Sequence, residues 1–305
     1  MSPDRPYALL DYPAYANVGD NAIWLGTLEA LRQLGAGPPA YTCCADTYHA
    51  DSLRRRVQDG PVLIKGGGNF GDLYPRHQRL RERVVRDFPD NPIVQLPQTV
   101  WFDDESGLAS ARAALGVHRD FTLQVRDERS LALGSARLGL RTELAPDAAM
   151  ALPPPPLSAR AELGVLWLLR ADGEARSEDL APAAGTEPVD WPADRKGGLA
   201  RRQRRLTRRV AAAPHEGLRM RRLRRTYDAL ARQRLAAGYA LLTSARAVVT
   251  DRLHGHLLCV LLDNRYGKNR TLFEAWTREV PFVRWAERDA DSVAEALADL
   301  ARRGS

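Results

Sequence analysis

Short apolar runs alternate with amphipathic helical segments through the first half of the chain. Four runs have the length and composition of buried strands, at residues 7–11, 62–66, 92–98 and 121–127. Three segments between them place apolar residues at helical spacing, at 20–35, 76–88 and 106–116. The first helix is predicted to begin after Asp20 as N-cap and to end at Gly35. This alternation predicts βαβ units and hence an α/β fold with a parallel sheet.

A proline run at residues 153–156 divides the chain. It cannot lie inside a helix or a central strand and suits a stiff linker. We therefore expect an N-terminal α/β domain at 1–152, a linker at 153–160 and a C-terminal α/β domain at 161–305. The second domain offers strand candidates at 164–170 and 247–251, a long loop at 171–198 and arginine-rich helices at 199–212 and 218–237. Two Rossmann-like domains facing a cleft that holds the active site are the simplest architecture.

The segment LIKGGGNFGDLYP raises the question of a nucleotide site. Gly66, Gly68 and Gly71 satisfy the pattern G-x-G-x-x-G after a predicted strand. A dinucleotide site also needs a helix opened by the glycines and an acidic residue about 20 positions on. Here Pro75 falls close behind the glycines and the next strand ends at Gln98, so this reading is disfavoured. No Gly-Lys-Ser/Thr follows, which excludes a Walker loop.

Consecutive glycines after a parallel strand still let another molecule approach the backbone. Asn69 and Asp72 present an amide and a carboxylate beside that opening, groups that suit a hydroxyl-rich ligand such as a sugar. The same Asn-x-Gly-Asp order recurs at Asn17, Gly19 and Asp20, also between a strand and a helix. The repetition favours a binding role, and the alternative is that these side chains only cap the following elements.

The segment TDRLHGH places Arg252 and His254 where a predicted strand meets a helix. A helix N-terminus with an added guanidinium and imidazole can hold a phosphate or carboxylate. Arg170, at the end of the predicted strand 164–170, is a second candidate cation. The alternative is an ordinary polar first turn. His254 and His256 lie two positions apart and cannot share one metal on a helix, so no metal site is expected.

The net charge of +7 comes mainly from arginine. The arginine-rich helices lack the aromatic interleaving of single-strand binders, so nucleic acid is disfavoured as a partner, whereas an anionic membrane surface or a pyrophosphate-linked lipid suits them better. No apolar run approaches the ~20 residues that span a bilayer, and the N-terminus lacks the apolar core of a signal peptide. We expect a cytoplasmic protein, with the inner membrane face as an alternative location.

Taken in order, the motifs resemble the polysaccharide pyruvyl transferase family from about residue 11 to residue 276. The motifs that carry this resemblance are NVGDNAIWLG, GGGNFGDLYPRHQ, IVQLPQTV, VRDERS, APDAAM, LLRADGEAR, VVTDRLHGHLL and DNRYGK. The resemblance implies a GT-B-like two-domain architecture. It also implies transfer of a carboxyethylidene group from phosphoenolpyruvate to two hydroxyls of a saccharide, with release of phosphate and without a cofactor.

Roles carry over from the resemblance to residues of this chain. Arg252 and His254 match the Arg-x-His that serves phosphoenolpyruvate, with Arg170 and Lys268 as further donor-binding candidates. We expect His254 to act as acid or to assist departure of phosphate, and Asp72 or Asp20 to act as base. The acceptor-binding candidates are Asn17, Gly19, Gly67, Gly68, Asn69 and Gln98. The acceptor is expected to be a cell-surface polysaccharide precursor, and a lipid-linked form is compatible with the basic helices.

One departure from the family pattern concerns the donor side. Family members usually carry a Gly-x-Pro-His and apolar segment before the DNxYGK element, but here Leu262 is followed directly by Asp263. Arg265 also stands where a small serine is usual. Two alternatives therefore remain beside the transferase: a nucleotide-sugar glycosyltransferase of GT-B type, and a catalytically impaired family member that serves as a binding or scaffold protein.

Overall fold

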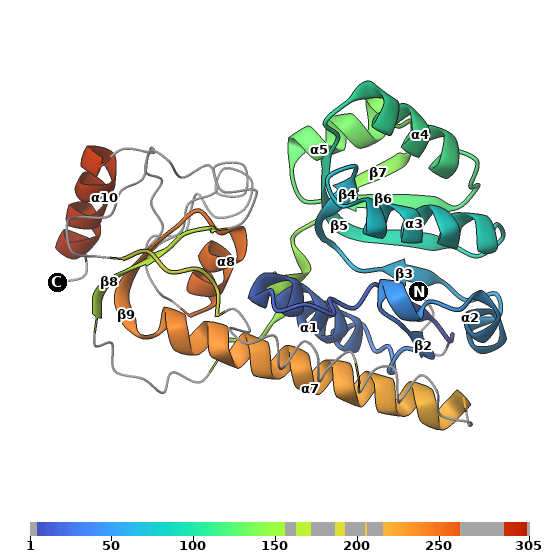
Figure 1. The fold of residues 1–305 in the computed structure, drawn as a ribbon, viewed down its shortest axis with the longest axis horizontal. Coiled ribbons are helices and arrows are strands. Elements are labelled where there is room, and N and C mark those ends of the chain that lie inside the picture. The colour runs from blue at the N-terminus through green and yellow to red at the C-terminus, as the bar shows by residue number, and fades with distance from the viewer. Residues whose placement is uncertain are drawn as a thin grey trace. The chain divides into compact units, whose positions relative to one another are not determined.

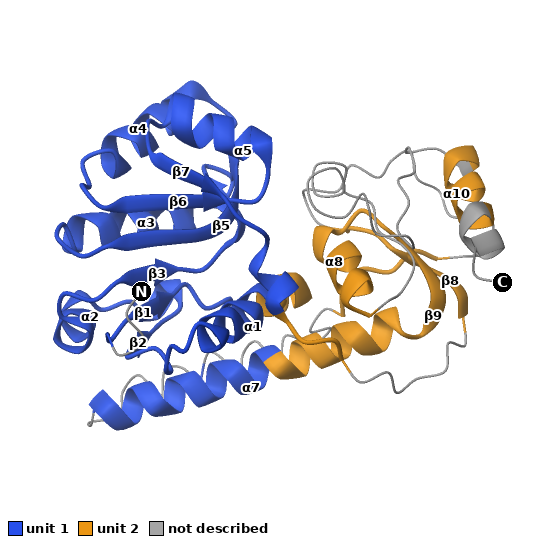
Figure 2. Cartoon of the chain, turned by 180° about the vertical axis from the view of Figure 1, so that it is seen from behind, with its two compact units in different colours: residues 1–15, 23–151, 196–231 blue, residues 16–22, 152–195, 232–305 orange. Residues whose placement is uncertain are grey.

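The computed structural model describes residues 5–155, 163–171, 187–192, 205, 216–262 and 290–303. The chain forms two compact units, which Figure 2 colours separately. Unit 1 contains Met1–Tyr15, Ile23–Ala151 and Lys196–Ala231, and unit 2 contains Ala16–Ala22, Leu152–Arg195 and Arg232–Ser305. This division differs from the contiguous one expected above, because one N-terminal segment belongs to unit 2 and one C-terminal segment to unit 1.

Unit 1 is built on a parallel sheet of seven strands. The strands are β1 (Ala8–Leu10), β2 (Tyr41–Thr42), β3 (Val62–Ile64), β4 (Gly67–Gly71), β5 (Ile93–Trp101), β6 (Phe121–Val125) and β7 (Arg141–Leu144) (Figure 1). Their order is β2-β1-β3-β5-β6-β7, with β4 paired to β5 beside this path, and every pair is parallel. The predicted α/β fold and the four predicted strands of this half are confirmed, whereas β2, β4 and β7 were missed.

Helices connect the strands. Three lie where the sequence predicts them, near 20–35, 76–88 and 106–116, and two shorter helices were missed. They are α1 (Val18–Gln33), α2 (Ala50–Val57), α3 (Pro75–Asp87), α4 (Glu105–Leu115) and α5 (Glu128–Ala132), with a π-helical turn at Leu133–Arg137. Shorter 3-10 turns lie at Ala45–Thr47 and Ala148–Ala151. The predicted N-cap of the first helix is wrong: Asn17 Oδ1 accepts from the backbone N–H of Asp20, so Asn17 caps and Asp20 lies in the first turn. The same helix ends before Gly35, as predicted.

The glycine-rich segment, placed by the sequence between a strand and a helix, is itself the strand β4. Pro97 lies within β5, where the register of β5 against β6 shifts between Gln95 and Gln98. The first part of β5 pairs with β3 and the second part with β4. Gly71 has φ of 128° and lies against the backbone of Trp101, where a Cβ would collide with its carbonyl group. Glycine is therefore required where β4 ends against β5.

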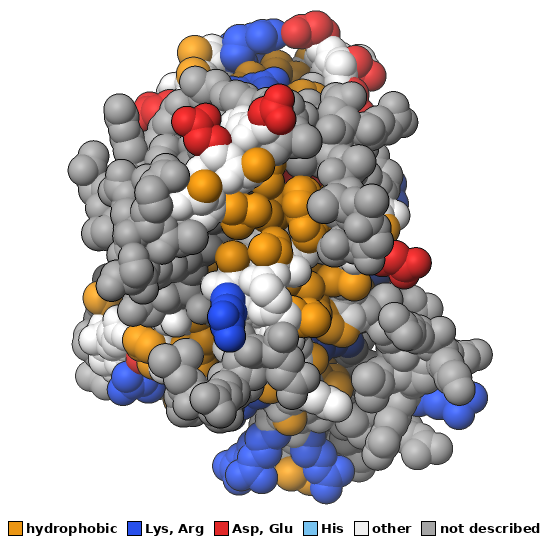
Figure 3. All heavy atoms as spheres, turned by 90° about the vertical axis from the view of Figure 1, so that its left-hand side faces the viewer, with side chains coloured by type: hydrophobic (Ala, Val, Ile, Leu, Met, Phe, Trp, Pro, Cys, Tyr) orange, Lys and Arg blue, Asp and Glu red, His pale blue; other side chains and the backbone are white. Residues whose placement is uncertain are grey.

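Unit 2 contains the C-terminal elements. Its strands β8 (Leu163–Leu168) and β9 (Ala245–Thr250) are parallel, and Val189 forms an isolated bridge to β8. The helices are α8 (Leu253–Leu261), α10 (Ala290–Arg303) and the C-terminal part of α7 (Glu216–Leu242). A core cluster joins β8, β9 and α10 through Trp167, Leu169, Val249, Val293 and Ala296. Figure 3, viewed from the side of α10 and β8, shows hydrophobic side chains gathered in the middle of that face.

The second arginine-rich helix is longer than predicted, because α7 continues over 27 residues. A buried stripe runs along it at helical spacing through Met220, Leu223, Tyr227, Ala231 and Leu235. The exposed arginines lie off this stripe, at 221, 222, 225 and 232. The first predicted arginine-rich helix and most of the proline-rich linker lie outside the described residues. Among the helices that the structure describes, none has the length and apolar character to cross a membrane.

Candidate functional site

A buried network of polar side chains lies at the carboxyl edge of the unit 1 sheet. Asn69 follows β3 through the glycines, and Gln98 lies in β5 beside it. The Gln98 amide donates to Asn69 Oδ1 at 2.8 Å, and the Asn69 backbone N–H donates to Gln98 Oε1 at 3.2 Å. Both side chains are buried, whereas Gly68 next to them is exposed. The buried pair holds the exposed glycine backbone in place. Because ligands of parallel α/β sheets bind at the carboxyl ends of the strands, this backbone is a candidate binding surface.

Arg81 of α3 lies at the centre of this network. Its guanidinium donates to three amide oxygens, at 2.7 Å to Gln95, 2.6 Å to Gln78 and 3.2 Å to Asn69. The group also lies 4.2 Å from the centre of the Phe70 ring. The side chain is fully buried, and burial lowers its pKa to about 10 although nearby carboxylates oppose the shift. A buried cation with three fixed acceptors holds α3 against β4 and β5 in one arrangement.

Asp11 and His77 form a pair at the end of β1, in which Asp11 is buried and His77 is partly exposed. Asp11 has φ of 66°, and its carboxylate oxygens lie 2.9 and 2.8 Å from His77 Nδ1. Burial would raise the pKa of Asp11, but the hydrogen bond and charge of His77 and the charges of Lys65 and Arg81 outweigh it and lower the pKa. The ionised carboxylate only accepts, so Nδ1 of His77 carries the proton and the ring is oriented.

Arg126 follows β6 and contributes a second buried cation. It donates to Asp147 Oδ2 at 2.6 Å and to Thr99 Oγ1 at 2.8 Å, and its backbone N–H donates to the Gln98 carbonyl at 3.1 Å. A Cβ at Gly68 would lie 3.4 Å from its guanidinium. Arg126 therefore lies directly beside the glycine segment, held by a carboxylate from the loop after β7.

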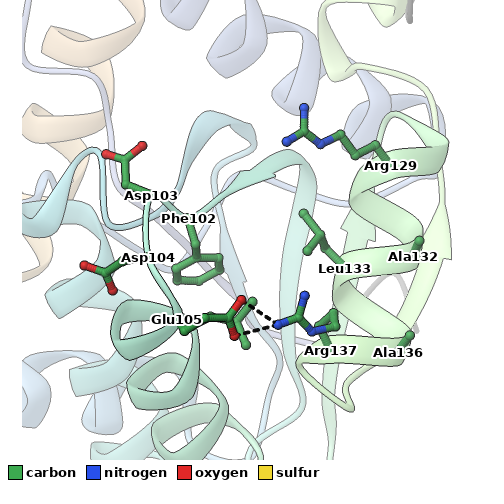
Figure 4. Close-up of a pocket in the computed structure, with 10 residues that line it drawn as sticks. Phe102, Asp103, Asp104, Glu105, Arg129, Ala132, Leu133, Ala136 and Arg137 are labelled. Atoms are coloured by element: carbon green, nitrogen blue, oxygen red, sulfur yellow. Dashed lines mark hydrogen bonds and ion pairs between the residues drawn. The ribbon is translucent and has the colours of Figure 1, made fainter.

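Asp72 directly follows the last glycine of β4. Its carboxylate accepts the backbone N–H of Asp103 at 2.9 Å and so fixes the turn after β5. A cavity of about 520 Å³ opens beside this turn, between the start of α4 and the turn after α5. Figure 4 shows the Glu105–Arg137 ion pair, at 2.6 Å, between its walls, with Phe102 and Leu133 facing the interior. Its mixture of apolar and charged groups is typical of ligand pockets.

In unit 2, Arg252 is the N-cap residue of α8. Its side chain is nearly buried and forms a two-point ion pair with Asp190, with Nε at 2.8 Å from Oδ1. Asp190 also accepts the backbone N–H groups of Ala171 and Trp191. Arg252 is thus held in a fixed orientation at a helix N-terminus.

The sequence predicts that Arg170 ends a strand, but β8 ends two residues earlier, at Leu168. Its backbone N–H donates to Asp251 Oδ1 at 2.9 Å, which joins the end of β8 to the end of β9. Burial raises the pKa of Asp251, opposed by this hydrogen bond and by the charges of Arg252 and Arg170. Two cationic residues thus belong to adjacent strand ends. Lys268, the third predicted donor-binding residue, lies outside the described residues.

His254 is in the first turn of α8 and Gly19 in the first turn of α1, and both belong to unit 2. Gly19 is buried against the His254 side chain, so closely that a Cβ would meet the ring. Asn17 and Asp20 lie in the same segment, Ala16–Ala22. The structure therefore assigns these three residues to the unit that contains Arg252. In the part of the chain that the structure describes, no group of three His, Cys, Asp or Glu residues could hold a metal ion.

His256 predicts a pH dependence of stability. The residue is fully buried, and burial lowers its pKa to about 4. The unfolded chain, with an ordinary pKa of about 6.5, binds the proton more readily, so stability falls as pH drops from about 6.5 towards 4. Between pH 7.5 and 5 we expect a loss of about 2 kcal/mol, measured by urea unfolding. His256→Gln is expected to flatten this dependence; an equally steep loss in the variant would contradict the assignment.

Several residues of these arrangements were not singled out from the sequence. Asp11 and Arg126 each follow a strand at its carboxyl end, a position that could have marked them. His77 and Arg81 lie four positions apart on α3 and so share one face, a second available signal. Asp190 had no such signal, because it belongs to a stretch without periodicity.

Comparisons with known proteins identify the family of this chain. The sequence model of the family described as "Polysaccharide pyruvyl transferase" matches residues 17–263. Pyruvyl transferase 1 of Schizosaccharomyces pombe is 32% identical over 278 residues, which are 85% of this chain and 64% of that protein. This chain thus spans less than two thirds of that relative. The EpsO protein of Bacillus subtilis is 30% identical over 290 residues, 90% of this chain and 86% of its own length.

A solved structure shows the same fold at lower sequence similarity. It is the crystal structure of an uncharacterized protein from Klebsiella pneumoniae, with a TM-score of 0.58, 14% identity and coverage of 93% of each chain. The family match covers most of this chain and includes both the glycine strand with Asn69 and the helix start with Arg252 and His254. The chain belongs to the polysaccharide pyruvyl transferase family.

Proposed function

We propose that this chain transfers a carboxyethylidene group from phosphoenolpyruvate to two hydroxyls of a saccharide in a cell-surface polysaccharide precursor. The observation that supports the proposal is the placement of Arg252, oriented by Asp190 at the N-terminus of α8, with His254 in the first turn of the same helix. Guanidinium, imidazole and helix N–H groups suit a donor with one phosphate and one carboxylate. The family to which the chain belongs supports the same donor.

The chemistry requires both an acid and a base. The methylene carbon of phosphoenolpyruvate takes a proton, the adjacent carbon becomes oxocarbenium-like, and a sugar hydroxyl attacks it while losing its proton. The bond from this carbon to the phosphate oxygen then breaks, and the second hydroxyl closes the ketal. The two sugar hydroxyls lose one proton each. One of these protons balances the proton taken up by the methylene carbon, and the other leaves with the phosphate. Arg252 and Arg170 stabilise the charge of the donor and of the departing phosphate.

In this scheme His254 acts as acid or assists phosphate departure. The base remains a choice between Asp72, which accepts the Asp103 N–H, and Asp20, which lies in the first turn of α1. Conversion of each to asparagine separates them: the base variant is expected to lose about 10²–10⁴-fold in turnover. Full activity of both variants would remove both assignments.

We place the acceptor in unit 1, at the exposed Gly68 and the buried Asn69–Gln98 pair that supports it. His77 extends this site, because its ring is oriented by Asp11 and flanked edge-on by Tyr15 and Tyr74, with centroids at 6.2 and 6.5 Å. Aromatic rings and oriented hydrogen-bonding groups suit a pyranose. A lipid-linked acceptor at the inner membrane face would explain the exposed arginines of α7, which attract anionic headgroups.

Thermal unfolding with added ligand tests this function before any acceptor is known. Phosphoenolpyruvate at 100 times its dissociation constant is expected to stabilise the folded state by ~2.7 kcal/mol, whereas UDP-sugars should leave the melting temperature unchanged. Acceptor-dependent release of phosphate from phosphoenolpyruvate, with saccharides extracted from membranes, is the second readout. Stabilisation by a UDP-sugar alone would favour a glycosyltransferase, and no response to either ligand would favour a scaffold role.

A further inference from the structure

The first turn of α1 packs against His254, although the two are far apart in the sequence. Gly19 is buried, and a Cβ placed on it would lie 2.5 Å from Cγ and 2.7 Å from Cβ of His254, and closer still to Nδ1. Carbon atoms that are not bonded normally pack at about 3.5–4.0 Å. The His254 side chain therefore occupies the space that any side chain at position 19 would need.

Rotation of the imidazole cannot relieve this contact. The clash includes Cβ of His254, which stays in place when the ring turns about its bond to Cβ. A shift of α8 is opposed by its packing: Leu257, Leu258 and Cys259 are buried, and a Cβ on Gly255 would lie 2.7 Å from Thr250 Oγ1. Tightly packed elements such as this helix start do not move by fractions of an ångström without cost.

The first turn of α1 is held on a second side by α7, within the same unit. Val18 packs so closely on α7 that a Cβ at Gly238 would lie 3.3 Å from Cγ2 of Val18, with Cγ1 closer still. The Asn21 side chain donates to the Asn17 carbonyl at 2.7 Å, which adds to the rigidity of the turn. The turn is therefore fixed between α7 and α8 and cannot retreat from His254.

We propose that Gly19 is a positioning residue for His254. Gly19 contributes no side chain to the reaction. Because it lacks a side chain, the backbone of α1 packs directly against the imidazole and holds its orientation at the N-terminus of α8. This inference rests on the proposed function, in which His254 meets the phosphoenolpyruvate donor. It assigns the Asn17–Asp20 segment to the donor side rather than to the acceptor side.

Gly19→Ala tests the inference. Alanine has a higher helix propensity than glycine, so the substitution by itself should not destabilise α1. If Gly19 mattered only for the stability of α1, donor binding would be unchanged. We expect the dissociation constant for phosphoenolpyruvate, measured by calorimetry, to rise at least tenfold. The imidazole NMR signal of His254 should move, and its response to phosphoenolpyruvate should disappear. Gly164→Ala is the matched control, because no atom lies within 4 Å of a Cβ at that position in β8 of the same unit.

His254→Ala separates this inference from the proposed function. If His254→Ala binds phosphoenolpyruvate and turns over like wild type, the donor assignment of the proposed function fails. If His254→Ala is impaired but folded Gly19→Ala binds phosphoenolpyruvate within twofold of wild type, the positioning role alone is overturned. Should Gly19→Ala fold poorly, the double variant Gly19→Ala/His254→Gly decides: recovery of the melting temperature supports the contact, and no recovery contradicts it.

Discussion

His254→Ala is expected to lower turnover by about 10²–10⁴-fold, the range of general acid–base catalysis. The side chain lies in the first turn of α8, beside the N-cap Arg252 and against Gly19. Its loss removes the imidazole that supplies or assists the proton, while Arg252 stays paired with Asp190 and keeps its orientation. Phosphate release from phosphoenolpyruvate in the presence of a saccharide acceptor is the measurement.

His118→Ala serves as the control for the loss of a histidine. His118 contacts the Phe88 carbonyl at 2.9 Å in unit 1 and has no part in the proposed chemistry. This variant should retain wild-type turnover. A His254→Ala variant with near-normal turnover would remove the central residue of the scheme, and the role of acid would then have to be assigned to another residue.

Arg81→Met is expected to lower the free energy of unfolding by about 3–5 kcal/mol. The buried guanidinium donates to the amide oxygens of Asn69, Gln78 and Gln95, and methionine would remove one donor from each of them. Asn69 and Gln78 each keep one other donor, whereas the Gln95 oxygen loses its partner. The variant also removes one of the cations that lower the pKa of Asp11. Urea unfolding monitored by circular dichroism measures the change.

Arg79→Met on the same helix is the matched control, because Arg79 is exposed. Its free energy of unfolding should stay within about 0.5 kcal/mol of wild type, as for most surface substitutions. Arg81→Lys is expected to fall between the two, since an ammonium keeps the charge but cannot match three acceptors in the geometry of a guanidinium. Equal stability of Arg81→Met and Arg79→Met would show that the network does not hold α3 in place.

Four strands and three helices of the first half could be predicted because their periodicity is local. Val62–Ile64 is a short continuous apolar run, and Pro75–Asp87 repeats apolar residues at helical spacing. Both patterns can be recognised from residues close together in the sequence. The strand Gly67–Gly71 could not, because glycine lacks any preference for a strand and its pairing depends on the shift in β5 at Pro97. The two-residue strand Tyr41–Thr42 is too short for a periodic signal.

The candidate site divides in the same way. Asn69 and Gln98 were marked because the sequence predicts them close to the ends of two strands, although they lie within β4 and β5. Arg252 and His254 were marked by their place at a helix start. Arg81 belongs to a helix with several arginines, and the sequence did not distinguish it from the others, yet it is fully buried. Asp190 gave no pattern at all, although it orients Arg252. Such partners are joined by packing between distant segments, which local periodicity does not encode.

The sequence by itself determined the α/β class, most of the strands and helices of the first half and the family, because each depends on local patterns or on ordered motifs. Only the tertiary structure decided that Gly19 belongs with His254 in unit 2, that Arg81 is buried among three amides and that Asp11 orients His77. The physical reason is that these contacts join segments far apart in the chain, and the cost of burying their polar and charged groups is met only when all partners are in place.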